Sequence, residues 1–500
     1  MKGAHRSVQE QLPYRLLAAA ALVTAMALML GLVALVLVSA GWGLWPKPLE
    51  LFQLKGGETV LGEKWGEESA PRGQGVRWRI KVGNRDLWGS DFRLLAKTEV
   101  VSISRPLDAW LLERFEYGNF YGFPQSLVLK DREEPATVPG FFKLVQDELK
   151  RMGKLRRETQ RLAKQLGRSS VAQEEELRKF EELQKAKEGC VLVMMASDGH
   201  QHQVPCSQIV HAWPMNQLGF LKKLGVFARR WVEFLGEEPR ESNTEGGIFP
   251  ALFGTALMVL LMTVGVVPLG VLTGVYLREY APDNRVTRLV RLAVSTLAGI
   301  PSIVFGAFGL AFFVYTVGGT IDRVFFADHL PNPTFGTGGI LWASLTLALL
   351  TLPVVVLATE EGLSAAPMAV REAVRALGAT RWETLRYVVL PYAKPGIFTG
   401  VILAVARAAG EVAPLMLTGV VKLAPTMPLD STPPFFHLER KFMHLGFHIY
   451  DVGFQSPNVE AARPVVFATT LVLLLLVLLL NALALHLRNR ARSQVGFQGI

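Results

Sequence analysis

Residues 371–391 read REAVRALGATRWETLRYVVLP, a basic and amphipathic stretch that lies between two of the most apolar parts of the chain. Apolar side chains recur at helical spacing before Gly378, and a glycine there suits the left-handed conformation that often ends a helix. Thr380 and Glu383 have the spacing of a capping box, which predicts a second helix that stops before Pro391. We therefore expect a helix, a glycine turn and another helix beside a membrane.

The composition of the whole chain indicates a membrane protein. Of its 500 residues, 50% are hydrophobic and 19% are charged, whereas a soluble chain carries about 25% charged residues. The apolar residues lie in blocks that are long enough to cross the roughly 30 Å hydrocarbon core of a bilayer. These blocks predict six transmembrane helices at 16–40, 250–277, 293–317, 338–359, 395–420 and 465–487.

The first apolar block has a second interpretation as a cleaved signal peptide, since Val38-Ser39-Ala40 resembles a cleavage site. The apolar core of a signal peptide normally spans only about 7–15 residues. The run at 16–40 is longer, which favours an uncleaved anchor.

The distribution of Lys and Arg predicts the orientation, because basic flanks stay on the cytoplasmic side. These residues are concentrated before the first span, between spans two and three, between spans four and five, and after span six. Both termini are therefore expected in the cytoplasm. The net charge of +10 comes largely from these basic flanks, which set the membrane topology. The arginines form no stripe on one soluble domain, which argues against a nucleic-acid partner.

The predicted fold class is thus an α-helical polytopic membrane protein with a domain between its first two helices. We expect a cytoplasmic N-terminus and anchor at 1–40, an extramembrane domain at 41–248, a five-span core at 249–490 and a cytoplasmic tail at 491–500. The domain at 41–248 is expected to be α+β, because strand-like runs alternate with a long helical stretch of mixed charge.

The only two cysteines bound a predicted hairpin whose turn is Asp198-Gly199. Strand ends brought together on an oxidising side of the membrane could form a disulfide between Cys190 and Cys206, and spacing alone leaves free thiols equally open. Further along, residues 218–235 form an amphipathic stretch containing Trp231, which is suited to lie on the surface of the lipid bilayer.

Arg407 and Glu411 are expected in the middle of span five, four residues apart on one helix face. A charged residue inside a membrane is costly and is kept where it faces the bundle interior or water. The planar guanidinium fork matches the oxygens of an oxyanion, and the carboxylate would offset its charge when the pathway is empty. The alternative is a structural ion pair that fixes helix packing.

Gly299-Ile300-Pro301-Ser302 is expected to interrupt span three, because proline removes a backbone donor. Ser302 would then satisfy a freed carbonyl or mark a half-helix that faces an anion, and a plain packing kink is the alternative. His444 and His448 share a helical spacing, but no third ligand is fixed, so we predict no metal site.

The stretch at 371–391 resembles the EAA loop of ABC importer permeases. It has Glu372-Ala373-Val374, then Gly378, and then Leu390-Pro391 at the spacing of that motif, with apolar replacements at two positions. The resemblance implies that the loop at 364–391 inserts into a groove of an ATPase subunit. An ordinary interfacial helix pair is the alternative.

Further segments resemble the PstA family of phosphate importer permeases, in its long form with an enlarged periplasmic domain. They are STLAGIPSIVFGAFGL (295–310), LPVVVLATEE (352–361), ARAAGEVAPLMLTG (406–419) and HIYDVGFQSPN (448–458). The resemblance implies an ABC importer permease fold in the bacterial cytoplasmic (inner) membrane, with 41–248 in the periplasm. It also implies three protein partners, namely a homologous second permease, an ABC ATPase dimer and a periplasmic phosphate-binding protein.

No catalytic role is expected for the chain itself. The segment from Gly57 that is most like a P-loop carries Glu63 where the lysine should stand, so ATP and Mg²⁺ are expected on the separate ATPase and no cofactor on this chain. Charge alone does not separate phosphate from sulfate or molybdate. A membrane sensor that signals through the loop is a third alternative.

Overall fold

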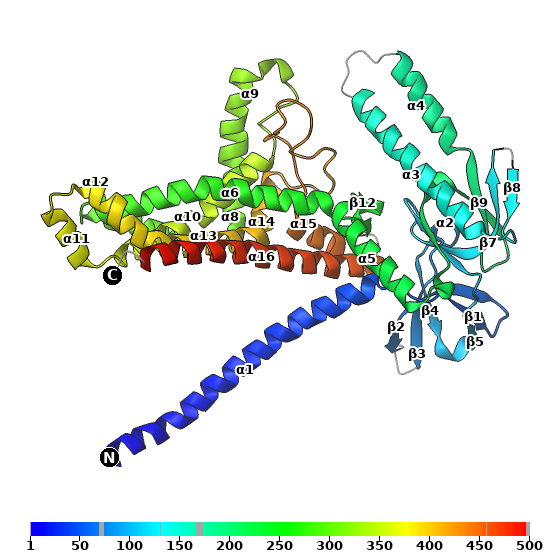
Figure 1. The fold of residues 1–500 in the computed structure, drawn as a ribbon, viewed down its shortest axis with the longest axis horizontal. Helices are drawn as coiled ribbons and strands as arrows, with labels where there is room; N and C mark the ends of the chain where they lie inside the picture. Colours follow the sequence, from blue (N-terminus) through cyan, green and yellow to red (C-terminus); the bar gives the residue numbers. More distant parts are fainter. Residues whose placement is uncertain (1, 70–74, 131, 167–173, 457, 497–500) are drawn as a thin grey trace. The chain divides into compact units, whose positions relative to one another are not determined.

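The computed structural model describes residues 2–69, 75–130, 132–166, 174–456 and 458–496, and the chain divides into two compact units (Figure 1). The membrane unit consists of two parts of the chain, the part up to Gly43 and the part from Phe234 onward. The inserted unit is the continuous segment Leu44–Glu233. Each unit buries hydrophobic clusters of its own.

Six helices of the described chain are long and apolar enough to cross a membrane, as predicted. They are Tyr14–Leu44, Phe249–Tyr280, Ser302–Phe325, Ile340–Ser364, Arg381–Gly410 and Val459–Arg490. The first belongs to α1 (Lys2–Leu44) and the last to α16 (Val459–Gly496). Four of them overlap the predicted spans closely, whereas the third and the fifth are displaced.

Helix α10 (Ile340–Ser364) forms the centre of the membrane unit. In its most apolar stretch of 18 residues, 67% of the residues are buried, against 6% in the corresponding stretch of α1. It packs against α6 (Phe249–Val275) and α13 (Leu390–Gly410), and α16 packs against α13 (Figure 1). The core of these helices includes Met258, Met262, Val266, Leu347, Val355 and Ala404. Glycines permit a close approach, since a Cβ on Gly396 would lie 2.7 Å from the Cα of Gly362.

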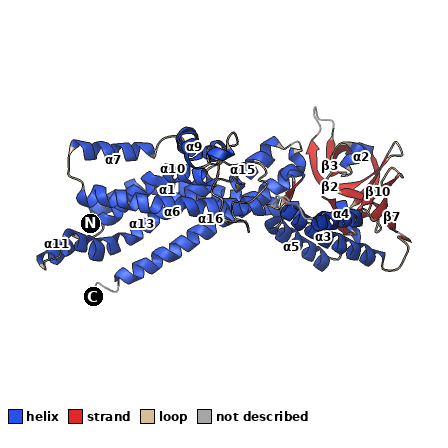
Figure 2. Ribbon diagram, turned by 90° about the horizontal axis from the view of Figure 1, so that it is seen from above, coloured by secondary structure: helices blue, strands red, loops and turns tan. Residues whose placement is uncertain are grey.

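The predicted third span, 293–317, was placed too early in the chain. The structure has a separate amphipathic helix, α7, which Figure 2 shows. The next span begins only at Ser302. The elements are α7 (Arg285–Leu297), α8 (Ser302–Phe308), the π-helical segment η7 (Gly309–Gly318) and α9 (Gly319–Phe325). Pro301 has an extended ψ of 136° directly before α8, so the proline separates two helices instead of kinking one.

The predicted fifth span, 395–420, was placed too late in the chain, because the observed helix runs from Arg381 to Gly410. One continuous helix runs through Pro391, so the second helix of the loop does not stop there as predicted. It consists of α12 (Arg381–Thr384), the π-helical segment η9 (Leu385–Val389) and α13. A proline clashes with the carbonyl four residues earlier in a regular helix, and the wider π turn directly before Pro391 accommodates it.

Two antiparallel sheets form the inserted unit. One has the order β4-β3-β2-β1-β5, and the other has the order β10-β9-β7-β6-β11 with β8 beside β7. The strands of the first are β1 (Glu50–Leu54), β2 (Thr59–Ser69), β3 (Val76–Lys81), β4 (Phe92–Ala96) and β5 (Val100–Ser104). Those of the second are β6 (Trp110–Arg114), β7 (Phe120–Leu129), β8 (Arg132–Pro135), β9 (Cys190–Met195), β10 (Gln201–Pro205) and β11 (Ile209–Trp213).

Helices complete the predicted α+β character of the inserted unit. They are α2 (Arg85–Trp88), α3 (Phe141–Leu166), α4 (Glu174–Lys187) and α5 (Phe220–Gly236), the last of which crosses into the membrane unit. One face of α3 carries Phe141, Val145, Leu149 and Met152, spaced by three or four residues. These side chains are buried in a cluster with Leu112 and Leu192 of the second sheet.

The predicted hairpin is confirmed. β9 pairs with β10 in an antiparallel register that sets Val191 opposite Pro205, and Gly199 in the turn has a positive φ of 83°. A disulfide joins Cys190 at the start of β9 to Cys206, which follows β10.

Candidate functional site

The loop at residues 364–391 contains two helices joined by a glycine turn. After α11 (Met368–Ala376), Gly378 adopts a φ of +89°, and a Cβ there would meet no atom within 4 Å. The backbone conformation, not a lack of space, therefore favours glycine. Thr380 Oγ1 accepts from the backbone N of Glu383 at 3.2 Å, and Glu383 Oε2 accepts from the backbone N of Thr380 at 2.8 Å. The predicted turn and capping box are both confirmed.

Arg371 fastens α11 to the ends of two transmembrane helices. Its Nη1 donates to Oε1 of Glu279 at 2.7 Å, in the π-helical segment η6 (Tyr276–Tyr280) that continues α6. Its Nε donates to the carbonyl of Ala366 at 3.3 Å, and its Nη2 donates to the carbonyl of Leu363 at the end of α10. Both charged side chains are nearly buried, so the pair is little screened by water.

A second ion pair lies at the same end of the bundle. Arg291 of α7 is 3.3 Å from Oε1 of Glu360 of α10, and its Nη2 donates to the carbonyl of Leu277 at 2.6 Å. The amphipathic helix α7 is thereby held against the same two spans that Arg371 connects.

A hydrophobic cluster lies beneath the loop. Leu363 at the end of α10 and Ala366 just after it are buried together with Leu385 and Val389 of η9. Val275 at the end of α6 packs against this cluster. The inner side of the loop is therefore fixed by apolar packing as well as by Arg371.

The outer side of the loop presents large apolar side chains. Leu377 is 88% exposed, and Met368, Trp382 and Tyr387 are exposed as well. Such a set on a short helical hairpin fits a groove on a partner better than it fits water.

The residues predicted for contact with an ATPase are divided between the two sides. Glu372, Ala373 and Gly378 are exposed, whereas Leu390 and Pro391 are half-buried where η9 passes into α13. Leu390 packs against the hydrophobic cluster beneath the loop.

The two charged residues predicted for the pathway form an ion pair, with 3.4 Å between Arg407 Nε and Glu411 Oε1. Their position corrects the prediction of a pair in mid-helix. Arg407 lies in the last turn of α13, and Glu411 ends that helix with an extended ψ of 132°. The helix ends shortly before Pro414, which has no N–H to donate to the carbonyl of Gly410. Both side chains remain partly exposed.

Ser302 is half-buried at the first position of α8. That helix packs against α14 (Ala413–Thr418), where a Cβ on Gly306 would lie 2.7 Å from the Cα of Pro414. The fold thus brings α8 next to the segment that follows Glu411. Within the described chain, no hydrogen bond joins Ser302 to either member of the ion pair.

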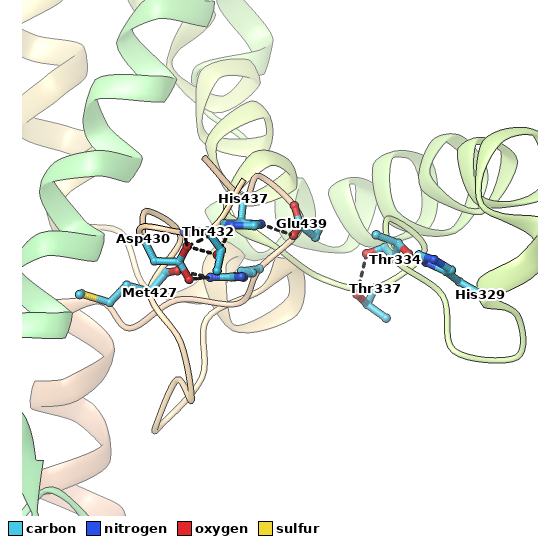
Figure 3. A network of polar contacts seen from close by, with 9 residues as sticks. His329, Thr334, Thr337, Met427, Asp430, Thr432, His437 and Glu439 are labelled. Carbon is cyan, nitrogen blue, oxygen red and sulfur yellow. Dashed lines mark hydrogen bonds and ion pairs between the residues drawn. The ribbon is translucent and has the colours of Figure 1, made fainter. Parts of the chain in front are cut away.

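The loop 421–463 is organised by a polar network around Asp430 (Figure 3). Arg440 Nη1 donates to Oδ2 of Asp430 at 2.7 Å and to the carbonyl of Met427 at 2.9 Å. His437 lies 3.3 Å from Asp430 and 3.1 Å from Glu439. The hydrogen bond from Arg440 holds the pKa of Asp430 well below its usual range.

A second polar group is centred on Asp451, whose side chain is buried. Lys422 Nζ and Asn243 Nδ2 each lie 3.2 Å from Oδ2 of Asp451. Burial lowers the pKa of His448 to about 4 and that of His444 to about 3. In the part of the chain that the structure describes, no group of three or more His, Cys, Asp or Glu is placed to hold a metal ion.

The sequence prediction did not find the residues that anchor the loop. Glu279, Arg291 and Glu360 are separated widely along the chain, and nothing in their spacing pairs them. The sequence feature that could have indicated them is the position of Glu279 and Glu360. Each carboxylate lies at the polar end of an apolar span, close in sequence to a predicted basic flank.

Comparison with known proteins finds that this chain is similar to the membrane subunits of ABC transporters. The family model described as binding-protein-dependent transport system inner membrane component matches residues 266–493. The Bacillus subtilis (strain 168) protein named "Probable ABC transporter permease protein YqgI" is 34% identical over 263 residues, which are 51% of this chain and 83% of that protein.

Other relatives are matched over a shorter region. "Phosphate transport system permease protein PstA 1" of Mycobacterium tuberculosis (strain CDC 1551 / Oshkosh) is 40% identical over 34% of this chain and 51% of that protein. "Phosphate transport system permease protein PstA" of Yersinia pestis is 35% identical over 36% of this chain and 56% of that protein. The chain thus spans only about half the length of these two relatives.

Among solved structures, an inward-facing MetNI methionine ABC transporter is 20% identical, with a TM-score of 0.36, over 48% of this chain and 94% of that chain. A bacterial ABC transporter involved in alginate import is 14% identical, with a TM-score of 0.37, over 54% of this chain and 90% of that chain. From its six spans, its family match and the length of its alignment to YqgI, the chain belongs to the ABC transporter permeases of the PstA family, which are non-catalytic multi-pass membrane subunits.

Proposed function

We propose that this chain is the permease subunit of an ATP-driven importer that carries inorganic phosphate across the bacterial cytoplasmic membrane. Both termini and the loop 364–391 face the cytoplasm, and the inserted unit faces the periplasm. The basic flanks of the spans support this orientation.

The observation that carries the proposal is the two-sided construction of the loop 364–391, which we call the coupling loop from here on. Its outer side exposes apolar residues such as Leu377 and Trp382, and its inner side is fastened to spans two and four through Arg371. A partner that binds the outer side and moves it will displace those spans with it. The partner is the ABC ATPase dimer, which binds ATP and Mg²⁺, and Glu372, Ala373, Gly378, Leu390 and Pro391 are the coupling residues.

Phosphate is proposed as the substrate because several relatives are named phosphate permeases. The Arg407–Glu411 pair supplies a suitable group, since a guanidinium donates two parallel hydrogen bonds to a tetrahedral oxyanion. Glu411 balances that charge when no anion is present, and Ser302 begins α8, which packs against α14, the helix that follows Glu411. A homologous second permease completes the pathway, and a periplasmic phosphate-binding protein delivers the anion.

ATP-dependent uptake in proteoliposomes tests this function. The chain is reconstituted with its second permease and ATPase, and radiolabelled phosphate is supplied with the binding protein. Uptake is expected to require ATP and to be abolished by unlabelled phosphate but not by sulfate or molybdate. Competition by sulfate or molybdate would instead identify a different oxyanion, and ATPase binding without uptake would favour a sensor.

A further inference from the structure

Helix α5 carries a continuous apolar stripe that faces solvent. The stripe, which we call the α5 face, consists of Leu221, Leu224, Ala228, Val232 and Leu235. These residues recur at intervals of three or four, so they lie on one side of the helix. Leu221 is 80% exposed and Val232 is 70% exposed, which is unusual for residues of this size.

The opposite side of α5 is fixed, so the helix cannot rotate to bury this face. Val226 is buried, and Phe227 packs on Trp45 with ring centroids 5.4 Å apart. Arg230 lies 2.7 Å from Glu113. Further along the helix, Glu233 is paired with a histidine of β11 at 2.9 Å.

The hydrogen bonds of α5 and of the residues directly after it reach the end of α1 and the start of α6. Arg230 Nη1 donates to the carbonyl of Leu44, the last residue of α1, at 3.2 Å. At the other end, the backbone N of Phe249, where α6 begins, donates to the carbonyl of Glu237 at 3.1 Å, directly after α5. The helix is therefore tied to the points where the first span ends and the second begins.

Basic residues border the α5 face. Lys222 and Arg229 are exposed beside the stripe, and neither stands within it. An amphipathic helix with an apolar face and flanking cations is the form that lies in the interface of a bilayer, where the cations reach anionic headgroups.

We propose that the α5 face rests in the headgroup and upper acyl region of the periplasmic leaflet and binds lipid. This contact anchors α5 itself at the membrane surface. It depends on the membrane topology and not on which anion is carried, so a failed phosphate assay leaves it intact.

The test uses the full transporter complex in nanodiscs that contain anionic lipid. Single cysteines replace Leu224 or Val232, or Leu177 as the matched control, and each is labelled with an environment-sensitive fluorophore. Leu177 is also an exposed leucine, at 46%, on helix α4 of the inserted unit. The native cysteines do not react because they are joined in the disulfide.

Labels at 224 and 232 are expected to be quenched by nitroxide lipids at least about threefold more than the label at 177, and to resist aqueous iodide. Quenching of all three by iodide alone would overturn the proposal. Protection of 224 and 232 from both quenchers would also overturn it, because a protein partner and not lipid would then cover the face.

Discussion

Arg371 of α11 and Glu279 at the end of the second span form an ion pair with 2.7 Å between Nη1 and Oε1, and both side chains are nearly withdrawn from solvent. Arg371 also donates to the carbonyl of Leu363 at the end of α10 and to that of Ala366 just after it. Removing one partner of a buried pair costs about 3–5 kcal/mol, because the other charge is left without compensation. The coupling loop is therefore held to two spans by a contact that is costly to break.

The positive φ of Gly378 predicts a penalty for any residue with a Cβ. Gly378→Ala is expected to strain the turn by about 1–2 kcal/mol and to weaken ATPase binding, which is measured by affinity of the purified subunits. Gly378→Asn is expected to keep more binding, because Asn tolerates the left-handed region better. Gly153→Ala in α3 is the control, since its surroundings are also open and it lacks a positive φ. Equal binding by all three variants would count against a conformational role.

Arg407 is predicted to act through the shape of its guanidinium and not only through its charge. Arg407→Lys keeps the charge but loses the fork, so phosphate uptake should fall by about tenfold or more while assembly is normal. Arg463→Lys, at an exposed position near the start of the last span, should leave uptake unchanged. Full uptake by the Arg407 variant would leave the ion pair with a packing role alone.

Burial of His448 predicts a loss of stability in acid. Its pKa is lowered from 6.5 to about 4 in the folded chain, so between these values the unfolded chain binds a proton that the folded chain does not. The free energy of unfolding should therefore fall as the pH decreases from 6.5 toward 4. When thermal unfolding is measured across this pH range, the unfolding temperature of His448→Gln should decrease less than that of the native chain. His200→Gln, at an exposed position in a turn, should behave like the native chain, and an unchanged slope in His448→Gln would contradict the prediction.

The disulfide of the inserted unit predicts sensitivity to reductant. A bridge between residues 16 apart stabilises a folded unit by about 3 kcal/mol through the entropy of the unfolded chain. Reduction should lower the unfolding temperature of this unit by roughly 10 °C, as followed by tryptophan fluorescence. The Cys190→Ser/Cys206→Ser double variant should unfold at the lower temperature with or without reductant. An unfolding temperature that does not change on reduction would show that the disulfide adds nothing to the stability of the unit.

Much of the fold follows from local signals in the sequence. The six apolar blocks, the capping box at Thr380 and the hairpin at Gly199 each depend on residues that are close in the chain, and each is present. The errors arise where proline has two possible effects. Pro301 separates two helices, whereas Pro391 is absorbed by a π turn within one, and this choice depends on packing that the sequence does not display.

The candidate site was less predictable than the fold. The exposed side of the coupling loop could be located from its pattern, but its attachment through Glu279 joins residues 92 positions apart. The burial of His444 and His448 was likewise hidden, because their helical spacing fits a metal site or a packed core equally well. Contacts of this kind depend on how the spans are arranged, and periodicity carries no such information.

The most direct test of the account is a charge exchange between Arg371 and Glu279, measured as ATP-driven phosphate uptake in proteoliposomes with an equal amount of assembled ATPase. Arg371→Glu and Glu279→Arg should each reduce uptake by about tenfold or more, and the double exchange should restore a substantial part of it. Arg288→Glu, at an exposed position on α7, serves as the control and should transport normally. Full uptake in both single variants, with the complex intact, would contradict the claim that this pair carries the movement of the ATPase to the spans.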